Sequence, residues 1–293
     1  MFHNQLRLPW QGFAARWLER LANSAALAGW RRRLLSKLPF LQLRSDVVDV
    51  VYANWVVPLD AVRHLLPDQL RLQEAAQHTI LTVLTYRHGH FGPALLGPLR
   101  HMLPSPLQSN WRLYVQEMPD GSGVGKVVLF IKNIFDSAMY GIGSRLFSDA
   151  LPSHVAQTFV HQKTAQGFQI QINGGSGSAP SFALEVALGG GKQLPPSMQA
   201  FFPTWEHAVD ALTQQDSALS PVAGAALIAH AGIDLPIPLP QVQPAVMSAA
   251  DPGDFLRQLG VKGPAFCFVV PQVPFRVLWE RCLRLESREI NRV

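Results

Sequence analysis

The chain has 293 residues, of which 48% are hydrophobic and 15% are charged, so it can bury a sizeable core and is not globally disordered. The formal net charge is +5, but residues 1–45 carry eight Lys or Arg side chains and a single acid, Glu19. The remaining residues are close to neutral and lack the dense basic face that nucleic-acid binding requires. The basic character therefore belongs to an N-terminal segment.

The cysteine content and the hydropathy of the chain indicate the cellular compartment in which we expect the protein. The two cysteines, Cys267 and Cys282, fit a reducing compartment. The start of the chain lacks the apolar region of a secretory signal, and no run approaches the ~18 apolar residues of a membrane span. We expect a cytoplasmic protein. Because the N-terminal segment is basic, peripheral contact with the inner membrane surface is an open alternative.

Residues 10–38 have the pattern of an amphipathic helix that Gly29 can divide and Pro39 ends. Large apolar side chains recur in it at roughly helical spacing between basic residues, and they are Trp10, Phe13, Trp17, Leu21, Trp30, Leu34 and Leu38. One interpretation is an interfacial helix on an anionic membrane. The other is a helix packed on the body with solvated arginines. We predict a helical arm at 1–43 and one further domain at 44–293.

The body is predicted to be rich in strands, with isolated short helices. Strands are expected at 46–57, 79–86, 110–117, 126–135, 155–163, 168–173, 182–188, 265–270 and 277–285. Helices are expected at 58–67, 137–147, 204–214 and 251–260, and turns at 119–125 and at the glycine-rich 174–178. The absence of regular βαβ alternation favours an α+β protein with a closed or strongly curved antiparallel sheet.

Several stretches resemble the YqjF-like proteins, which are grouped with the acetoacetate decarboxylase-like superfamily. They are NWVVPLDAVRHLLPDQLRL at 54–72, QSNWRLYV at 108–115, GVGKVVLFIKNIF at 123–135 and GSRLFSDALPSHVA at 143–156. The resemblance implies a mostly antiparallel, cone-shaped β-barrel around a small-molecule cavity, with peripheral helices. It also implies a homo-oligomer. It covers roughly residues 45–190 and excludes the N-terminal arm.

The chain departs from the decarboxylases at the residues that carry their chemistry. Those enzymes form an imine through one of two adjacent lysines, whose pKa is lowered by the other. At the matching positions this chain has Ser153 and His154. We therefore do not expect imine-forming decarboxylation, although Lys126, Lys132 and Lys163 stay open as relocated imine formers. Lys132 is the first of these because it lies among apolar residues of an expected strand.

The densest polar cluster contains Arg87, His88 and His90. The two histidines are two residues apart, so on a strand they would share a face and could supply two metal ligands. A third ligand, His101 or Glu117, would have to come from another segment, and we predict no metal and no cofactor. We expect the three side chains to lie at the mouth of the cavity and to bind an anionic or carbonyl group.

A second set of polar residues alternates along the expected strand at 110–117. Asn110, Arg112 and Tyr114 would share one face, where Arg112 can bind a carboxylate and Tyr114 can donate a hydrogen bond or a proton. The resemblance places Arg145 and His154 at the family's active-site helix. We predict Tyr114 and His154 as catalytic residues, and Asn110, Arg112 and Arg145 as substrate-binding residues beside the Arg87 cluster.

Two functions follow from these features. The first is binding of an oxo acid or related anionic metabolite, with or without acid–base catalysis; an enzyme would be of the aldolase, dehydratase or hydratase kind. The second is a non-catalytic scaffold or sensor that the helix at 10–38 holds at a membrane surface or partner. Whether the protein is an enzyme stays open at this stage.

Overall fold

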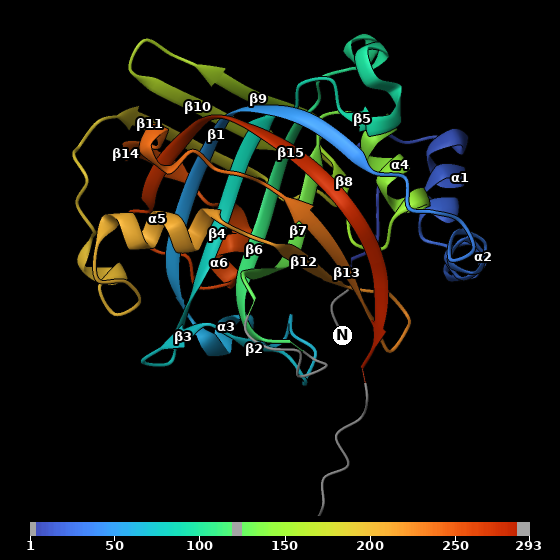
Figure 1. Cartoon of the computed structure of the whole chain (residues 1–293), viewed down its shortest axis with the longest axis horizontal. Coiled ribbons are helices and arrows are strands. Elements are labelled where there is room, and N and C mark those ends of the chain that lie inside the picture. The colour runs from blue at the N-terminus through green and yellow to red at the C-terminus, as the bar shows by residue number, and fades with distance from the viewer. Residues whose placement is uncertain (1–3, 119–124, 286–293) are drawn as a thin grey trace, which may run out of the picture.

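The computed structural model describes residues 4–118 and 125–285 (Figure 1). The turn expected at 119–125 lies outside these ranges except for its last residue. The strands are β1 (Leu43–Pro58), β2 (Arg71–Leu72), β3 (Glu74–Ala75), β4 (His78–Arg87), β5 (Gly92–Pro93), β6 (Leu107–Glu117), β7 (Val127–Phe135), β8 (His154–Val155), β9 (Thr158–Lys163), β10 (Gly167–Asn173), β11 (Phe182–Leu188), β12 (Ser217–Pro221), β13 (Leu227–Asp234), β14 (Gln243–Asp251) and β15 (Phe266–Arg284). The helices are α1 (Phe13–Ala22), α2 (Ala25–Leu35), α3 (Leu59–Arg63), α4 (Ala138–Phe147), α5 (Trp205–Thr213), α6 (Gly253–Gln258) and the 3-10 turns η1 (Ala94–Met102), η2 (Pro196–Met198) and η3 (Leu239–Gln241).

All the described strands belong to one 15-stranded sheet. Its central order is β1-β4-β6-β7-β12-β13-β15, and β15 also pairs with β1, so these strands close into a ring. From β15 the sheet continues through β14, β11, β10 and β9. Every pairing is antiparallel except those of β7 with β12 and β8. The predicted α+β class is confirmed, and the ring fits the predicted barrel.

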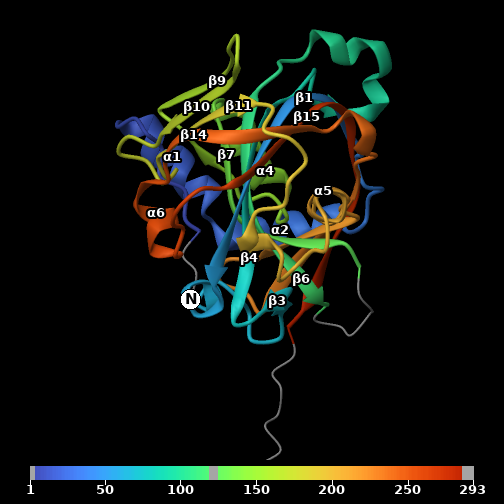
Figure 2. The same cartoon turned by 90° about the vertical axis from the view of Figure 1, so that its left-hand side faces the viewer.

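Alternate residues of β1, β4, β6 and β7 face two separate cores, as the two-residue period of a strand requires. On β6, Trp111 and Leu113 pack with β10, β11 and the residues of α6, which we call the α6-side core. Tyr114 packs instead with α5, in the α5-side core. Figure 2 shows α6 on one side of β1 and β4 and α5 on the other. The same four strands therefore separate the two cores.

The N-terminal arm is two helices rather than one. The chain breaks at Asn23 and Ser24, where the Ser24 hydroxyl caps α2 by accepting from the Leu27 backbone N–H, and not at Gly29. On α1, Ala15 is buried against α4, and on α2 the buried Arg31 forms a salt bridge with Asp149. No helix of the described ranges is long and apolar enough to cross a membrane.

Several boundaries differ from the sequence prediction. The strand expected at 155–163 is two, β8 and β9, and the helix at 58–67 shrinks to α3. The helix expected at 251–260 is the shorter α6. Asp251 instead ends β14, and its side chain accepts from the Gly253 backbone N–H. The sequence also gave no sign of β12, β13 and β14, because their short apolar runs are interrupted by Pro and Gly.

The last strand is one element where the sequence predicted two. β15 runs through Pro271 and Pro274, which interrupt the apolar pattern between 270 and 277. Across residues 270–275 it pairs only with β1, since β14 pairs up to Val269 and β13 begins at Arg276. A proline without an N–H is tolerated where one edge of a strand is unpaired. The long β15 therefore joins the ring and the outer strands.

Candidate functional site

The lysine–histidine centre is formed by Lys132, His154, Asn4 and Ser178, which come from four separate segments. The Lys132 Nζ lies 3.2 Å from the His154 Nε2. The Asn4 Oδ1 lies 2.5 Å from the same His154 nitrogen and 3.5 Å from Lys132 Nζ. His154 Nδ1 lies 2.7 Å from the Ser178 Oγ. Lys132 is 7% exposed and His154 is fully buried, so the centre is shielded from water.

A β-bulge turns Lys132 toward this centre. Trp111 on β6 pairs with Lys132, while the next residue, Arg112, pairs with Phe130, so Ile131 is an extra residue in β7. Simple alternation would place Lys132 on the face of Phe130, in the α5-side core. The extra residue instead puts Lys132 on the face of Trp111, in the α6-side core. Bulges of this kind commonly redirect a side chain beside a functional site.

The electrostatics of the centre lower the pKa of both bases. Burial, and then the positive charge of Arg145, lower the pKa of Lys132 to about 8. Burial, followed by the charges of Lys132 and Arg145, lowers the pKa of His154 well below its ordinary value. The Lys132 ammonium also lies over the Phe255 ring, 5.3 Å from its centroid. The centre therefore combines a lysine of lowered pKa with a neutral histidine, and the lysine lies beside the apolar Phe255 ring.

The hydrogen bonds of Asn4 assign the histidine tautomer. The Asn4 amide nitrogen donates to the Pro152 carbonyl, so Oδ1 is the atom that faces His154. An amide oxygen can only accept, so the proton of the neutral ring is on Nε2. On the other side of the ring, His154 Nδ1 lies 2.7 Å from the Ser178 Oγ, whose hydroxyl is also within donating distance of the Arg7 carbonyl. His154 is oriented from both sides, as a group that takes part in proton transfer requires.

Arg145 on α4 holds the segments of the centre together. Its guanidinium donates to the backbone carbonyls of Ser153 and Pro152, and its Nη2 donates to the Asn4 carbonyl at 2.7 Å. Burial lowers its pKa to about 10. Among the described residues it forms no salt bridge, so its charge acts on Lys132 and on the interior. Its predicted role in substrate binding stays a prediction.

Asn4 reaches the centre because the segment before α1 is held along its length. Leu6 and Leu8 are buried, and their N–H groups donate to Asn23 Oδ1 at 2.8 Å and Glu19 Oε1 at 2.7 Å. Ser178 accepts from the Arg7 N–H. Gly177 permits this approach, since a Cβ there would lie 3.0 Å from the Arg7 carbonyl oxygen. No pattern in the sequence singled out Asn4, because only this packing connects it to residues more than a hundred positions away.

Arg112 and Tyr114 lie in the other core. The Arg112 Nη2 and the Tyr114 hydroxyl both donate to the carbonyl of Leu212, at 2.6 Å and 3.1 Å, in the last turn of α5. The Arg112 guanidinium also lies over the Tyr52 and Tyr114 rings. These contacts clamp the C-terminus of α5, where a positive charge is favoured. The structure does not bring Tyr114 and His154 together, since they face opposite sides of the sheet.

Two of the remaining predicted residues, Asn110 and His88, are connected to each other through Gln108 and Asn133. Asn110 donates to Asn133 Oδ1 at 2.9 Å, on the face opposite Lys132. His88 is fully buried between Ser45 and Gln108, and burial lowers its pKa to about 4. Arg87 is exposed at the end of β4. The predicted ligand-binding role of these side chains stays a prediction, but they do not form one site with His154.

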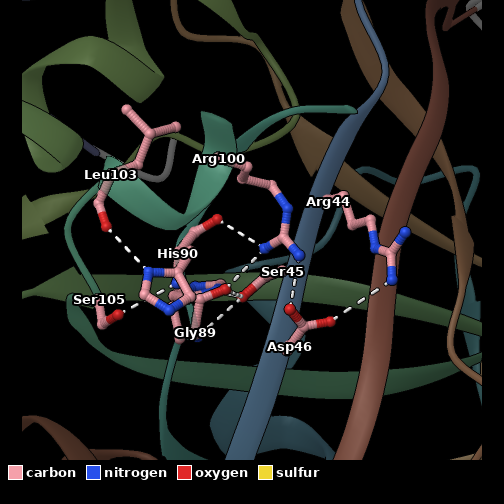
Figure 3. A network of polar contacts seen from close by, with 9 residues as sticks. Arg44, Ser45, Asp46, Gly89, His90, Arg100, Leu103 and Ser105 are labelled. Carbon is pink, nitrogen blue, oxygen red and sulfur yellow. Dashed lines mark hydrogen bonds and ion pairs between the residues drawn. The ribbon is translucent and has the colours of Figure 1, made fainter. Parts of the chain in front are cut away.

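His90 belongs to a loop that Arg100 holds in place (Figure 3). Arg100 donates to the carbonyls of Gly89 and His90 and forms a 2.5 Å salt bridge with Asp46. The Nδ1 of His90 lies 3.2 Å from the Leu103 carbonyl oxygen. Within residues 4–118 and 125–285, no group of three or more His, Cys, Asp or Glu side chains could hold a metal ion.

Solved structures with this fold are acetoacetate decarboxylase-like proteins. The structure described as enduracididine biosynthesis enzyme MppR complexed with pyruvate matches with a TM-score of 0.53 and 13% identity, over 85% of this chain and 93% of that chain. A structure of acetoacetate decarboxylase matches with a TM-score of 0.54 and 12% identity, over 86% and 92%. An acetoacetate decarboxylase-like enzyme from Sphingomonas wittichii RW1 matches with 0.53 and 9% identity, over 83% and 93%. The chain has the acetoacetate decarboxylase-like fold.

The family follows from the sequence model. The family described as DUF2071, an uncharacterized conserved protein (COG2071), matches residues 44–207, which is more than half of the chain. The protein belongs to this DUF2071, or YqjF-like, family, as the sequence motifs predicted. No curated relative matches the chain.

Proposed function

We propose that the protein binds a small oxo acid and that Lys132 forms an imine with its carbonyl group. In such a step the neutral amine attacks the carbonyl carbon, the C=N bond replaces C=O, and the oxygen leaves as water. The imine withdraws electrons from the neighbouring carbon, which suits lyase chemistry of the aldolase or dehydratase kind. The acetoacetate decarboxylase-like fold, which also includes the pyruvate-bound MppR, supports this choice of ligand class.

The observation that carries the proposal is the position of a buried lysine amine 3.2 Å from a buried histidine and over the Phe255 ring. With a pKa of about 8, about a tenth of the Lys132 amines are neutral at pH 7. A lysine with an ordinary pKa would be neutral in only roughly 0.03% of molecules. The gain of about 300-fold in reactive amine favours Lys132 over the exposed Lys126, which pairs with Asp210, and the exposed Lys163.

The surrounding residues support the same role. The His154 Nε2 lies 3.2 Å from the Lys132 amine, close enough to exchange a proton with it during imine formation. Arg145 adds an uncompensated positive charge, which favours an anionic ligand over a neutral one. The sequence alone favoured loss of the imine lysine, because His154 stands where the family has a lysine. Lys132, placed by the bulge beside His154, supplies an amine in the same neighbourhood.

Borohydride trapping tests the proposal. The full chain is incubated with a panel of 2- and 3-oxo acids near pH 8, reduced, and analysed by intact-mass spectrometry and peptide mapping. We expect one adduct on Lys132, which Lys132→Arg abolishes and the matched variant Lys163→Arg retains. No adduct with any member of the panel, or an adduct on a different lysine, would overturn the assignment.

A further inference from the structure

The N-terminal helices present large apolar side chains that the fold does not use. The exposed fractions of Trp10, Phe13, Trp17 and Trp30 are 40%, 79%, 54% and 61%. Three of the seven tryptophans of the chain are thus exposed within this short segment, whereas Trp55, Trp111 and Trp205 are buried in the body. Tryptophan rarely stands exposed in a cluster without a partner.

The opposite face of α1 already provides its attachment to the body. Ala15, Leu18 and Ala22 follow the helical period and pack against Ile142 and Leu146 of α4. Phe13 and Trp17 lie four residues apart, on a different face of the helix. Phe13 and Trp17 therefore do not attach α1 to the body, and the face that they form is available to a partner.

Basic side chains surround these aromatic residues. Arg16, Arg20, Arg33 and Lys37 are exposed, and none forms a salt bridge with another described residue. In contrast, Arg31 and Arg32 pair with Asp149 and secure α2 to the body. The exposed face is thus positively charged as well as apolar. We call the exposed side chains of this segment the N-terminal face; they are Trp10, Phe13, Arg16, Trp17, Arg20, Trp30, Arg33 and Lys37.

Further exposed apolar residues belong to η1 and α4, and they are Leu95, Leu99, Met102, Met139 and Phe147. Of these two elements, α4 packs against α1 of the arm. Figure 1 shows α1, α2 and α4 close together.

We propose that the N-terminal face binds peripherally to the surface of an anionic lipid bilayer. Aromatic side chains flanked by arginine and lysine match the boundary between lipid headgroups and acyl chains. The charges argue against a second copy of the chain as the occupant, because a symmetric pairing of this face would oppose four exposed cations with four more. This proposal goes beyond the oxo-acid chemistry and does not depend on it.

Vesicle co-sedimentation tests the proposal with the full chain. We expect binding to phosphatidylcholine vesicles that contain about one fifth phosphatidylserine, weak binding to pure phosphatidylcholine, and loss of binding at about 0.5 M salt. The pair Arg33→Gln and Lys37→Gln should weaken binding by about tenfold or more. Trp17→Ala with Trp30→Ala should weaken it by at least about tenfold.

A charge-matched control distinguishes binding by the N-terminal face from binding that depends only on the net charge of the chain. Arg71→Gln with Lys262→Gln removes two exposed cations outside the arm and should bind as the unaltered chain does. Circular dichroism confirms that each variant is folded. Failure of the folded chain to bind anionic vesicles, or equal loss in the control pair, overturns the proposal. A dimer that Trp17→Ala and Trp30→Ala dissociate, without vesicle binding, would assign the face to a second copy instead.

Discussion

Replacing the buried lysine should stabilise the protein while removing the amine. In Lys132→Met a thioether of similar length takes the place of a side chain that is 7% exposed and lies over the Phe255 ring. The fall of its pKa from 10.5 to about 8 corresponds to roughly 3 kcal/mol of stability lost when the lysine is charged in the folded state. At pH 7 we expect the variant to be more stable by about 1–3 kcal/mol.

The stability difference between Lys132→Met and the unaltered chain should depend on pH. The folded-state pKa of Lys132 lies below the unfolded value, so between about pH 8 and 10.5 the unfolded chain binds more protons. The stability of the unaltered chain therefore gains from this group as the pH rises through that window. The advantage of Lys132→Met should accordingly shrink as the pH rises from 8 to 10.

Urea denaturation at pH 7 and at about pH 10 measures both effects. Lys163→Met is the control, because Lys163 is exposed on β9 and its replacement should change stability by less than about 0.5 kcal/mol. A variant Lys132→Met that is less stable than the unaltered chain at pH 7 would refute the reasoning. An advantage that does not change with pH would do the same, because it would show that the lysine charge is not desolvated.

Three further outcomes follow from the same structure. The rate of borohydride-trapped adduct formation at Lys132 should rise about tenfold from pH 7 to pH 9 and then level off, and a flat profile would contradict a pKa of about 8. Asp149→Asn should lower stability by about 3–5 kcal/mol in thermal unfolding, because Arg31 would keep a buried charge without its carboxylate. Burial lowers the pKa of both His88 and His161 to about 4, so their unfolded forms bind more protons below pH 6.5 and stability should fall between pH 6.5 and 4. His88→Gln should flatten that loss in urea titrations by roughly 2–3 kcal/mol, and an unchanged acid dependence would count against a buried neutral His88.

Local patterns were enough for four of the seven strands that build the ring. The β-branched and aromatic runs that became β1, β4, β6 and β7 were found to within three residues, because their side chains face apolar cores on both sides. The helix predicted at 137–147 is likewise present as α4. The family and the fold class could therefore be predicted from the residues alone.

The composition of the site could be predicted only in part. His154 and Arg145 were identified by resemblance, and Lys132 was one of three open candidates. Tyr114 and Arg112 were grouped with them because the sequence does not show which face of a strand points to which core. The structure separates them, and Arg112 and Tyr114 contact the Leu212 carbonyl of α5 instead.

Composition and periodicity are local properties, and they were enough to predict a basic, aromatic segment followed by a mostly antiparallel α+β fold. Local patterns could not predict that Lys132 faces His154, because one extra residue in β7 reverses the face on which it lies. Tertiary structure alone decided that Asn4 completes the centre, through contacts across 128 and 150 positions of the chain. Such contacts leave no periodic signal, because they depend on how distant segments pack rather than on their neighbours in sequence.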